Sequence, residues 1–168
     1  KKLMVKKNTI IVTGGAGFIG GTLIRKLIKD KNWIIYNIDK MGYASDLSWI
    51  KDSKEYKLRH LFLKIDLRNK EKLENLVKDI RPNLIIHLAA ESHVDRSIDN
   101  PLNFIESNII GTFNLLEASR AYWEKTSDIN KKLFKFIHVS TDEVFGSLGS
   151  DGKFDENTKY SPRSPYSS

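Results

Sequence analysis

The stretch VTGGAGFIGG, residues 12–21, decides the fold of this chain. It follows an apolar, β-branched run, TIIVT at 9–13, and opens a pattern typical of an amphipathic helix. Gly14, Gly17 and Gly20 give the spacing G-x-x-G-x-x-G. In such a turn the first glycine makes the bend, the second lets backbone N–H groups approach a pyrophosphate, and the third packs the helix on the strand. The motif therefore predicts a dinucleotide site.

The rest of the chain alternates between strand and helix patterns. Strands are predicted at 9–13, 33–39, 59–66, 83–90 and 133–140, and helices at 17–30, 69–80 and 100–123. Several strands are apolar throughout, as parallel strands covered on both faces are. We therefore predict an α/β fold with a doubly wound, parallel, Rossmann-like sheet. Its ligand-binding edge, at the carboxyl ends of the strands, would carry residues 14–20, 39–46, 66–67, 89–96 and 140–146.

The composition limits the class of protein. The 168 residues are 40% hydrophobic and 29% charged, as expected of one globular domain. No run approaches the ~18 apolar residues of a membrane span, and no signal peptide is recognised. The absence of cysteine excludes disulfides and thiolate metal ligands, and no spacing suggests another metal site. We expect a soluble, cytoplasmic protein without a metal or a membrane partner.

A net charge of +7 raises the question of nucleic acid. Basic residues gather at Lys1, Lys2, Lys6 and Lys7 and again over 25–31, and elsewhere they alternate with acidic ones. No basic stripe is interleaved with aromatic residues. A solvated surface is favoured over a nucleic-acid site, while the positive field would attract an anionic small molecule such as a nucleotide.

Asp39 supports the dinucleotide interpretation. It ends the second predicted strand, at the distance expected of a carboxylate that binds the cofactor ribose. Because Asp39 would repel a 2′-phosphate, NAD is favoured over NADP, although Lys40 beside it weakens that preference. The alternative is a glycine turn with a purely structural aspartate.

The segment HLAAESHVDRS, residues 87–97, follows the fourth predicted strand. Ala89 and Ala90 are small enough for a ligand to lie against the backbone, and Ser92 and His93 bring hydrogen-bonding groups to the same edge. His93 could equally be structural. His87, inside the strand, is assigned to the core.

The segment STDEVFG, residues 140–146, follows the fifth predicted strand. Asp142 and Glu143 are either turn residues or a proton donor and a proton acceptor held in different environments. Thr141 could hydrogen-bond a substrate oxygen. Tyr166 could act as a base only if a nearby cation lowered its pKa of ~10, so the residues alone favour an aromatic at the edge of the loop 146–168.

Together these motifs resemble the dTDP-glucose 4,6-dehydratase family of extended short-chain dehydrogenases/reductases. The supporting stretches cover nearly the whole chain: TGGAGFIG, NIDKMGYASDL, HLAAESHVDRSI, FIESNIIGTFNLLEASRAYW, FIHVSTDEVFGSLG and FDENTKYSPRSPYS. The glycine motif is shared widely, whereas AAESHVDRS and STDEV are more specific. Related epimerases tend to carry a serine-rich segment in place of Thr141-Asp142-Glu143, and related decarboxylases carry Thr-Ser-Glu.

The resemblance implies NAD-dependent loss of water from a nucleotide-activated hexose, with dTDP-glucose favoured. Tyr166 would take the proton of the 4-OH, Glu143 the C5 proton, and Asp142 would protonate the departing 6-OH, while Ser92 and Thr141 would contact the sugar. The alternatives are a UDP-, CDP- or GDP-sugar dehydratase, an epimerase, a decarboxylase, or a non-catalytic NAD-binding module. Relatives of this kind pair as homodimers through helices that include the 100–123 region.

The resemblance also implies which residues contact NAD. They are Gly14, Gly17, Phe18, Ile19, Gly20, Asp39, Lys40, Met41, Gly42, Asp66, Leu67, Leu88, Ala89, Ala90, Glu91, Ser92, Ser107 and Tyr166.

The sequence departs from the family pattern in three places. Gly42 and Ser45 stand where the family has Thr and Gly, and Phe145 stands where it usually has Tyr. The sequence also stops at Ser168, before the lysine expected four residues after Tyr166. We therefore expect residues 1–168 to be an NAD-binding Rossmann domain, truncated before the last strands and the nucleotide-sugar domain, and to lack catalytic competence alone.

Overall fold

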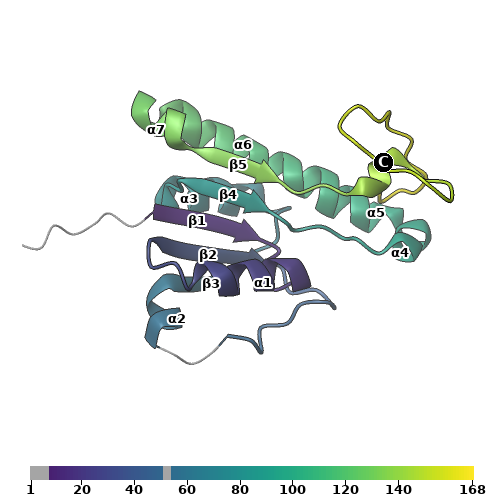
Figure 1. The fold of residues 1–168 in the computed structure, drawn as a ribbon. Coiled ribbons are helices and arrows are strands. Elements are labelled where there is room, and N and C mark those ends of the chain that lie inside the picture. The colour runs from purple at the N-terminus through teal and green to yellow at the C-terminus, as the bar shows by residue number, and fades with distance from the viewer. Residues whose placement is uncertain (1–7, 51–53) are drawn as a thin grey trace, which may run out of the picture.

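The computed structural model describes residues 8–50 and 54–168. Within these ranges, strands and helices alternate along the chain (Figure 1). The strands are β1 (Asn8–Thr13), β2 (Trp33–Asp39), β3 (His60–Lys64), β4 (Leu84–His87) and β5 (Lys135–His138). The helices are α1 (Phe18–Leu27), α2 (Lys54–Arg59), α3 (Lys70–Ile80), α4 (Val94–Asp99), α5 (Pro101–Phe104), α6 (Gly111–Lys125) and α7 (Asp128–Leu133), with a π-helix, η1 (Ile105–Ile110), and a short 3₁₀ helix, η2 (Asp142–Phe145). The predicted basic group Lys1, Lys2, Lys6 and Lys7 lies outside the described residues.

The five described strands form one parallel sheet in the order β3-β2-β1-β4-β5. Thr13, the last residue of β1, lies opposite Ile38 in β2 and His87 in β4. Because the strands are parallel, their carboxyl ends open on one edge of the sheet. The predicted α/β, Rossmann-like fold is confirmed.

Helices cover both faces of the sheet, and β1 contributes side chains to the core on each face. Ile10 and Val12 pack with Ile24 of α1, whereas Ile11 packs on the other side with Leu73 of α3. All of these side chains are fully buried. Alternate residues of a strand point to opposite faces, so a strand covered on both sides is apolar throughout.

Three strands are shorter than the sequence predicts. The strands predicted at 59–66, 83–90 and 133–140 correspond to β3, β4 and β5, each of which begins later and ends earlier than predicted. β4 ends at His87, where its pairing with β1 also ends at Thr13. Residues 88–90 therefore leave the sheet and become part of the ligand edge.

Arg59, predicted to begin a strand, instead ends α2, a helix that the sequence patterns did not reveal. Its guanidinium group donates to the backbone oxygens of Ile28 and Asp30, the latter at 2.8 Å. These bonds tie α2 to the end of α1. The short helices α4 and α7 were also missed, because six residues carry too little periodicity to be recognised.

The helix predicted at 100–123 is found between Pro101 and Lys125, but it is not continuous. It consists of α5, the π-helical segment η1 and α6. Pro101 occupies the first turn as expected, and Asn100 precedes it as the N-cap but makes no side-chain capping bond. Side chains of η1 contact distant residues, as described below.

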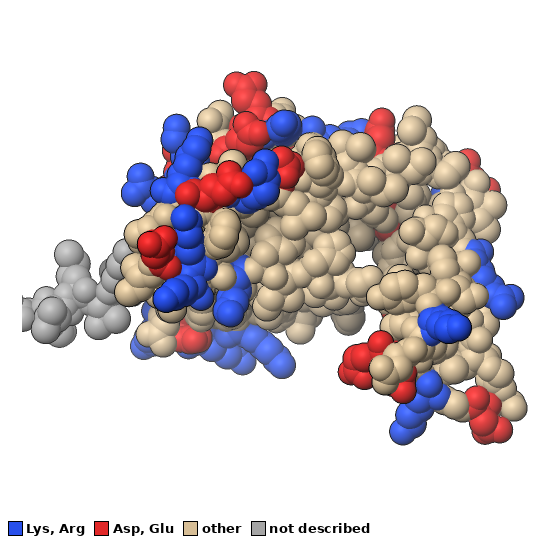
Figure 2. All heavy atoms as spheres, turned by 90° about the horizontal axis from the view of Figure 1, so that it is seen from above, with Lys and Arg blue, Asp and Glu red and all other residues tan. Residues whose placement is uncertain are grey.

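Residues 146–168 form neither helix nor strand, and Figure 1 shows them as a looped segment beyond the carboxyl ends of β4 and β5. None of the helices in the described ranges is long and apolar enough to cross a membrane. On the face seen in Figure 2, basic and acidic side chains are intermixed and form no single basic stripe.

Candidate functional site

The glycine turn between β1 and α1 adopts a conformation that other residues would not tolerate. Gly14 has a φ of 69°, and a Cβ atom there would lie 2.7 Å from the backbone nitrogen of Ala89. A Cβ atom at Gly20 would lie 2.2 Å from the carbonyl oxygen of Gly14. The turn therefore packs directly against the loop after β4, and α1 packs directly on the turn. These are the backbone positions that the glycine spacing predicted.

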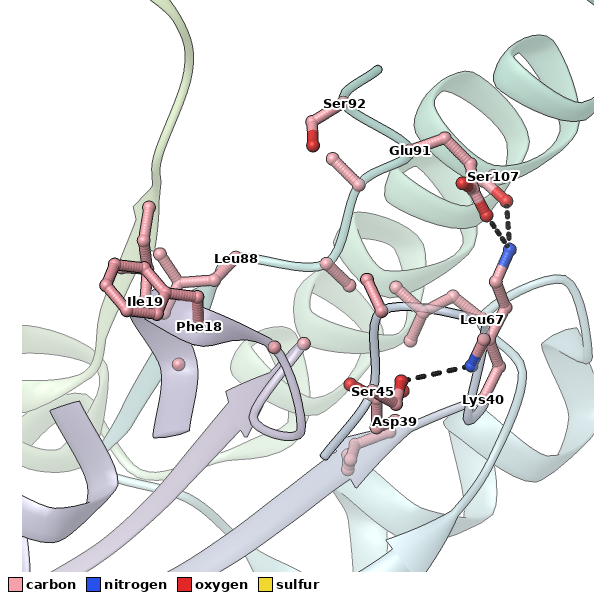
Figure 3. A pocket seen from close by; sticks show the side chains of 18 of the residues that line it. Phe18, Ile19, Asp39, Lys40, Ser45, Leu67, Leu88, Glu91, Ser92 and Ser107 are labelled. Carbon is pink, nitrogen blue, oxygen red and sulfur yellow. Dashed lines mark hydrogen bonds and ion pairs between the residues drawn. The ribbon is translucent and has the colours of Figure 1, made fainter. Parts of the chain in front are cut away.

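A pocket of about 430 Å³ lies beside this turn, at the carboxyl ends of β1, β2 and β4 (Figure 3). All of the predicted cofactor residues line it except Met41 and Tyr166. Segments separated by up to about ninety positions in the sequence, from the turn at Gly14 to Ser107 in η1, thus meet around one cavity.

Asp39, at the end of β2, is nearly buried and held by three donors. Its Oδ2 accepts the Ala16 N–H at 3.1 Å, and its Oδ1 accepts the Met41 N–H at 2.8 Å and the Ser45 hydroxyl at 3.1 Å. The Gly42 N–H in turn donates to Ser45 Oγ at 3.0 Å. Met41 does not line the pocket; its contribution is this backbone bond, made in a left-handed conformation with φ 64°.

Lys40 spans one side of the pocket. Its Nζ lies 2.6 Å from Glu91 Oε1 and 2.9 Å from Ser107 Oγ (Figure 3). The backbone of Glu91 is held in turn by Asn108, whose side chain accepts from its N–H and donates to its carbonyl, both at 2.9 Å. The loop after β2, the loop after β4 and η1 are therefore joined through polar side chains.

Asp66 lies where the chain passes from β3 toward α3. Partial burial opposes its charged form, but hydrogen bonds from Arg68 and the charge of that guanidinium outweigh this and lower the pKa of Asp66. Arg68 also binds Glu106 of η1 at 2.5 Å. Beside this pair, the buried side chain of Asn114 donates to the carbonyl oxygens of Leu67 and Arg68 at 3.1 and 3.2 Å. The loop carrying Asp66 and Leu67 is thus fixed against η1 and α6.

His87 lies behind the pocket, in the core as predicted. Its Nδ1 is 2.6 Å from Thr13 Oγ1, and its Nε2 is 2.8 Å from Thr112 Oγ1. Thr13 Oγ1 also accepts the backbone N–H groups of Leu88 and Ala89, two residues that line the pocket. Burial, with a smaller contribution from the charge of His138, lowers the pKa of His87 to about 4, so the ring is neutral at pH 7.

The pocket also includes residues that were not among the predicted NAD contacts, although four of them lie in the segments predicted to form the ligand edge. They are Ile38, Tyr43, Ala44, Ser45, Ile65 and His93. The ring of Tyr43 packs edge-on against His93 at 5.4 Å, and the guanidinium of Arg96 lies 3.7 Å from its centroid. The prediction that 39–46 and 89–96 share one edge of the sheet contained the signal for this cluster, although it did not single out Tyr43.

The four residues predicted to be catalytic do not line the pocket, whereas Ser92, also predicted to contact the sugar, does. Thr141 accepts the Glu143 N–H at 3.2 Å and so caps η2, while Asp142 and Glu143 are exposed. Tyr166 is half-buried with its ring 6.4 Å from that of Phe104. The segment 140–146 does follow β5, which pairs with β4 in parallel, and so leaves the sheet at the same edge as the pocket. The catalytic roles of these residues stay predictions.

Comparison with known proteins identifies relatives along nearly the whole chain. Residues 11–168 match the family described as GDP-mannose 4,6 dehydratase. The chain is 45% identical over 162 residues to a dTDP-glucose 4,6-dehydratase of Neisseria gonorrhoeae, covering 96% of this chain and 46% of the relative. It is 46% identical over 158 residues to a probable dTDP-glucose 4,6-dehydratase of Sinorhizobium fredii, covering 94% of this chain and 45% of the relative. The chain thus spans about half the length of the curated relatives it matches.

Solved structures agree with this assignment. A dTDP-glucose 4,6-dehydratase of Bacillus anthracis in complex with NAD superimposes with a TM-score of 0.77 and 36% identity, over 95% of this chain and 46% of the other. A UDP-glucose 4-epimerase of Thermus thermophilus in complex with NAD superimposes with a TM-score of 0.78 and 28% identity, over 95% of this chain and 46% of the other. From its matching segment, its fold and these identities, the chain belongs to the GDP-mannose 4,6 dehydratase family, as a dTDP-glucose 4,6-dehydratase-like short-chain dehydrogenase/reductase that corresponds to the N-terminal part of its relatives.

Proposed function

We propose that this chain binds NAD in the pocket beside the glycine turn and forms the cofactor-binding portion of a nucleotide-sugar 4,6-dehydratase, with dTDP-glucose as the favoured substrate. The observation that carries the proposal is the meeting of the glycine turn with Asp39 around one cavity. The sequence similarity to dTDP-glucose 4,6-dehydratases favours the dTDP sugar over UDP, CDP or GDP sugars.

The residues present fit a dinucleotide. The first backbone N–H groups of α1 would bind the pyrophosphate, because a helix N-terminus offers unpaired donors and a positive dipole end. Asp39 would accept the ribose hydroxyls. Phe18, beside the turn, is 90% exposed although it is a large apolar residue, as a side chain that covers a bound ligand would be.

NAD⁺, when bound, supplies a hydride acceptor for C4 of the sugar and returns the hydride to C6. Tyr166 would take the proton of the 4-OH as the 4-ketone forms. Glu143 would then remove the C5 proton, which the adjacent ketone acidifies, and Asp142 would protonate the 6-OH so that it leaves as water. Ser92 and Thr141 would hold the sugar oxygens. After the hydride reaches C6 and a proton returns to C5, the net change is the loss of one water.

A homodimer is part of the proposal. Five large apolar side chains along α5, η1 and α6 are between 45% and 60% exposed: Leu102, Ile105, Ile109, Phe113 and Leu116. They recur at intervals of three or four residues, so they form one apolar stripe. A contiguous exposed apolar surface of this kind is typical of an interface between protein chains.

The binding step can be tested on the chain itself by titration calorimetry with NAD⁺. We expect a saturable site with 1:1 stoichiometry in the wild-type chain, and binding weakened at least about tenfold in Gly14→Ala, because its Cβ atom would displace the loop at Ala89. The control Gly149→Ala, whose Cβ atom would meet nothing within 4 Å, should bind as the wild type does. An absence of NAD⁺ binding by the wild-type chain would contradict the proposal.

The catalytic step is tested on a protein of the length of the relatives that contains this chain. Incubated with dTDP-glucose, it should form the 4-keto-6-deoxy product. In that protein, Glu143→Gln should block exchange of the C5 proton with solvent, and Asp142→Asn should slow water loss more than C4 oxidation. If NAD⁺ binds but no nucleotide sugar is turned over, the chain is a non-catalytic NAD-binding module.

A further inference from the structure

The pocket is rich in carboxylates and poor in cations. Asp39, Asp66 and Glu91 line it, and among its described lining residues Lys40 is the only Lys or Arg. Asp66 is compensated by Arg68, which lies outside the lining. The positive charge available to a ligand near Asp39 therefore depends on where the Lys40 ammonium group lies and what it is paired with.

The ammonium group of Lys40 is already engaged. Figure 3 shows Lys40 extending from the end of β2 toward Glu91 and Ser107. The ion pair to Glu91 is 2.6 Å long and the hydrogen bond to Ser107 is 2.9 Å. The two bonds between Asn108 and Glu91 hold the backbone from which that carboxylate extends. We call the contact of Glu91 and Ser107 with Lys40 the Lys40 clamp.

Asp39, by contrast, is held by uncharged donors. Three donors hold its carboxylate at the pocket, and none of them is a cation. Ribose hydroxyls can donate to such a carboxylate, but a 2′-phosphate is a dianion that would meet Asp39 with no free Lys or Arg charge among the described lining residues. The same ligand would be accommodated if the ammonium of the neighbouring Lys40 could turn toward it.

We propose that the Lys40 clamp is a determinant of cofactor specificity: by holding the Lys40 ammonium against Glu91 and Ser107, it withholds the only Lys or Arg charge among the described lining residues that could neutralise a 2′-phosphate, and so excludes NADP in favour of NAD. This inference rests on the proposed NAD site. It assigns to Glu91 and Ser107 a role in discrimination, exerted through Lys40, in addition to their place in the pocket wall.

The test measures the dissociation constants of NAD⁺ and NADP⁺ by titration calorimetry for the wild-type chain and for Glu91→Gln combined with Ser107→Ala. Release of Lys40 should tighten NADP⁺ binding about tenfold or more relative to NAD⁺ binding, so the ratio of the two dissociation constants should change by about that factor. The gain should shrink as salt is raised, since it comes from an exposed charge. The matched control Glu106→Gln removes a neighbouring carboxylate that pairs with Arg68 and does not touch Lys40, so it should leave the ratio of the two constants unchanged.

A third substitution identifies the source of any gain in NADP⁺ affinity. Adding Lys40→Met to the double variant should abolish that gain. A gain that persists without Lys40 would assign discrimination to the charge of Glu91 alone and overturn the inference, as would unchanged NADP⁺ binding in the double variant that still binds NAD⁺. Failure of the wild-type chain to bind NAD⁺ would instead refute the proposed function, and the inference with it.

Discussion

Acidification should weaken this fold through one buried side chain, His87. The ring is 2% exposed and joins β4 to Thr13 and Thr112. Thr13 Oγ1 accepts two backbone N–H groups, so its hydroxyl proton points to His87 Nδ1, and Nε2–H donates to Thr112. A proton added to Nδ1 would meet the proton of Thr13, and the charge would be buried.

The magnitude follows from the two protonation states. The pKa of His87 is about 4 in the folded chain, against about 6.5 for an unfolded histidine. Above pH 6.5 the ring is neutral in both states and the stability is complete. As the pH falls from about 6.5 to 4, the unfolded chain binds the proton first, and the free energy of unfolding falls by about 3 kcal/mol.

Urea unfolding of the wild-type chain and of His87→Gln, followed between pH 7.5 and 4, measures this loss. Glutamine retains a donor and an acceptor but does not titrate, so contributions from other groups cancel in the difference between the two proteins. The wild-type chain should be the more stable at pH 7.5, and its advantage should fall by about 3 kcal/mol by pH 4. A difference that stays constant within about 0.5 kcal/mol over that range would refute the assignment of a neutral, buried imidazole.

Three other substitutions follow from single contacts. Gly20→Ala should lower the free energy of unfolding by about 1–3 kcal/mol in urea titrations, because its Cβ atom would lie 2.2 Å from the Gly14 carbonyl, while Gly149→Ala stays within about 0.5 kcal/mol of the wild type. Asn114→Ala should lower the free energy of unfolding by about 1–3 kcal/mol and weaken NAD⁺ binding, because the carbonyl oxygens of Leu67 and Arg68 lose their donor. The control is Asn103→Ala, at an exposed position, and equal effects from that substitution would contradict the reasoning. Phe113→Lys should convert a dimer to a monomer in sedimentation velocity, and a wild-type chain that is already monomeric would remove the basis for the proposed interface.

The sheet and the glycine turn could be predicted because their determinants are local. An apolar strand, a glycine at each tight position and an acidic residue at the end of β2 all lie within residues 9–39. The ends of β4 and β5 could not be predicted in the same way, because a strand ends where its neighbour ends, and the pairing of His87 with Thr13 is a contact between distant segments. Arg59 shows the same limit, since its partners Ile28 and Asp30 lie in the distant turn that follows α1.

The members of the pocket were predicted better than their contacts. Motif spacing and resemblance placed Lys40, Glu91 and Ser107 at one cavity, yet nothing in the pattern indicated that they bind one another across 51 and 67 positions. Hydrogen bonds between distant side chains depend on the three-dimensional path of each loop, which periodicity does not describe. The same holds for Asp39 and Ser45, whose bond depends on the course of the loop between them.

The π-helical segment η1 constrains how the length of this chain can change. Three consecutive side chains there, Glu106, Ser107 and Asn108, reach three different partners, while Leu115 and Ala118 of the following α6 are buried in the core. Deleting one residue of η1 would restore an ordinary α-helix and rotate one side by about 100° relative to the other. Either the core of α6 or the wall of the pocket would then be lost. We therefore expect this segment to diverge through replacement of side chains, and to resist any insertion or deletion.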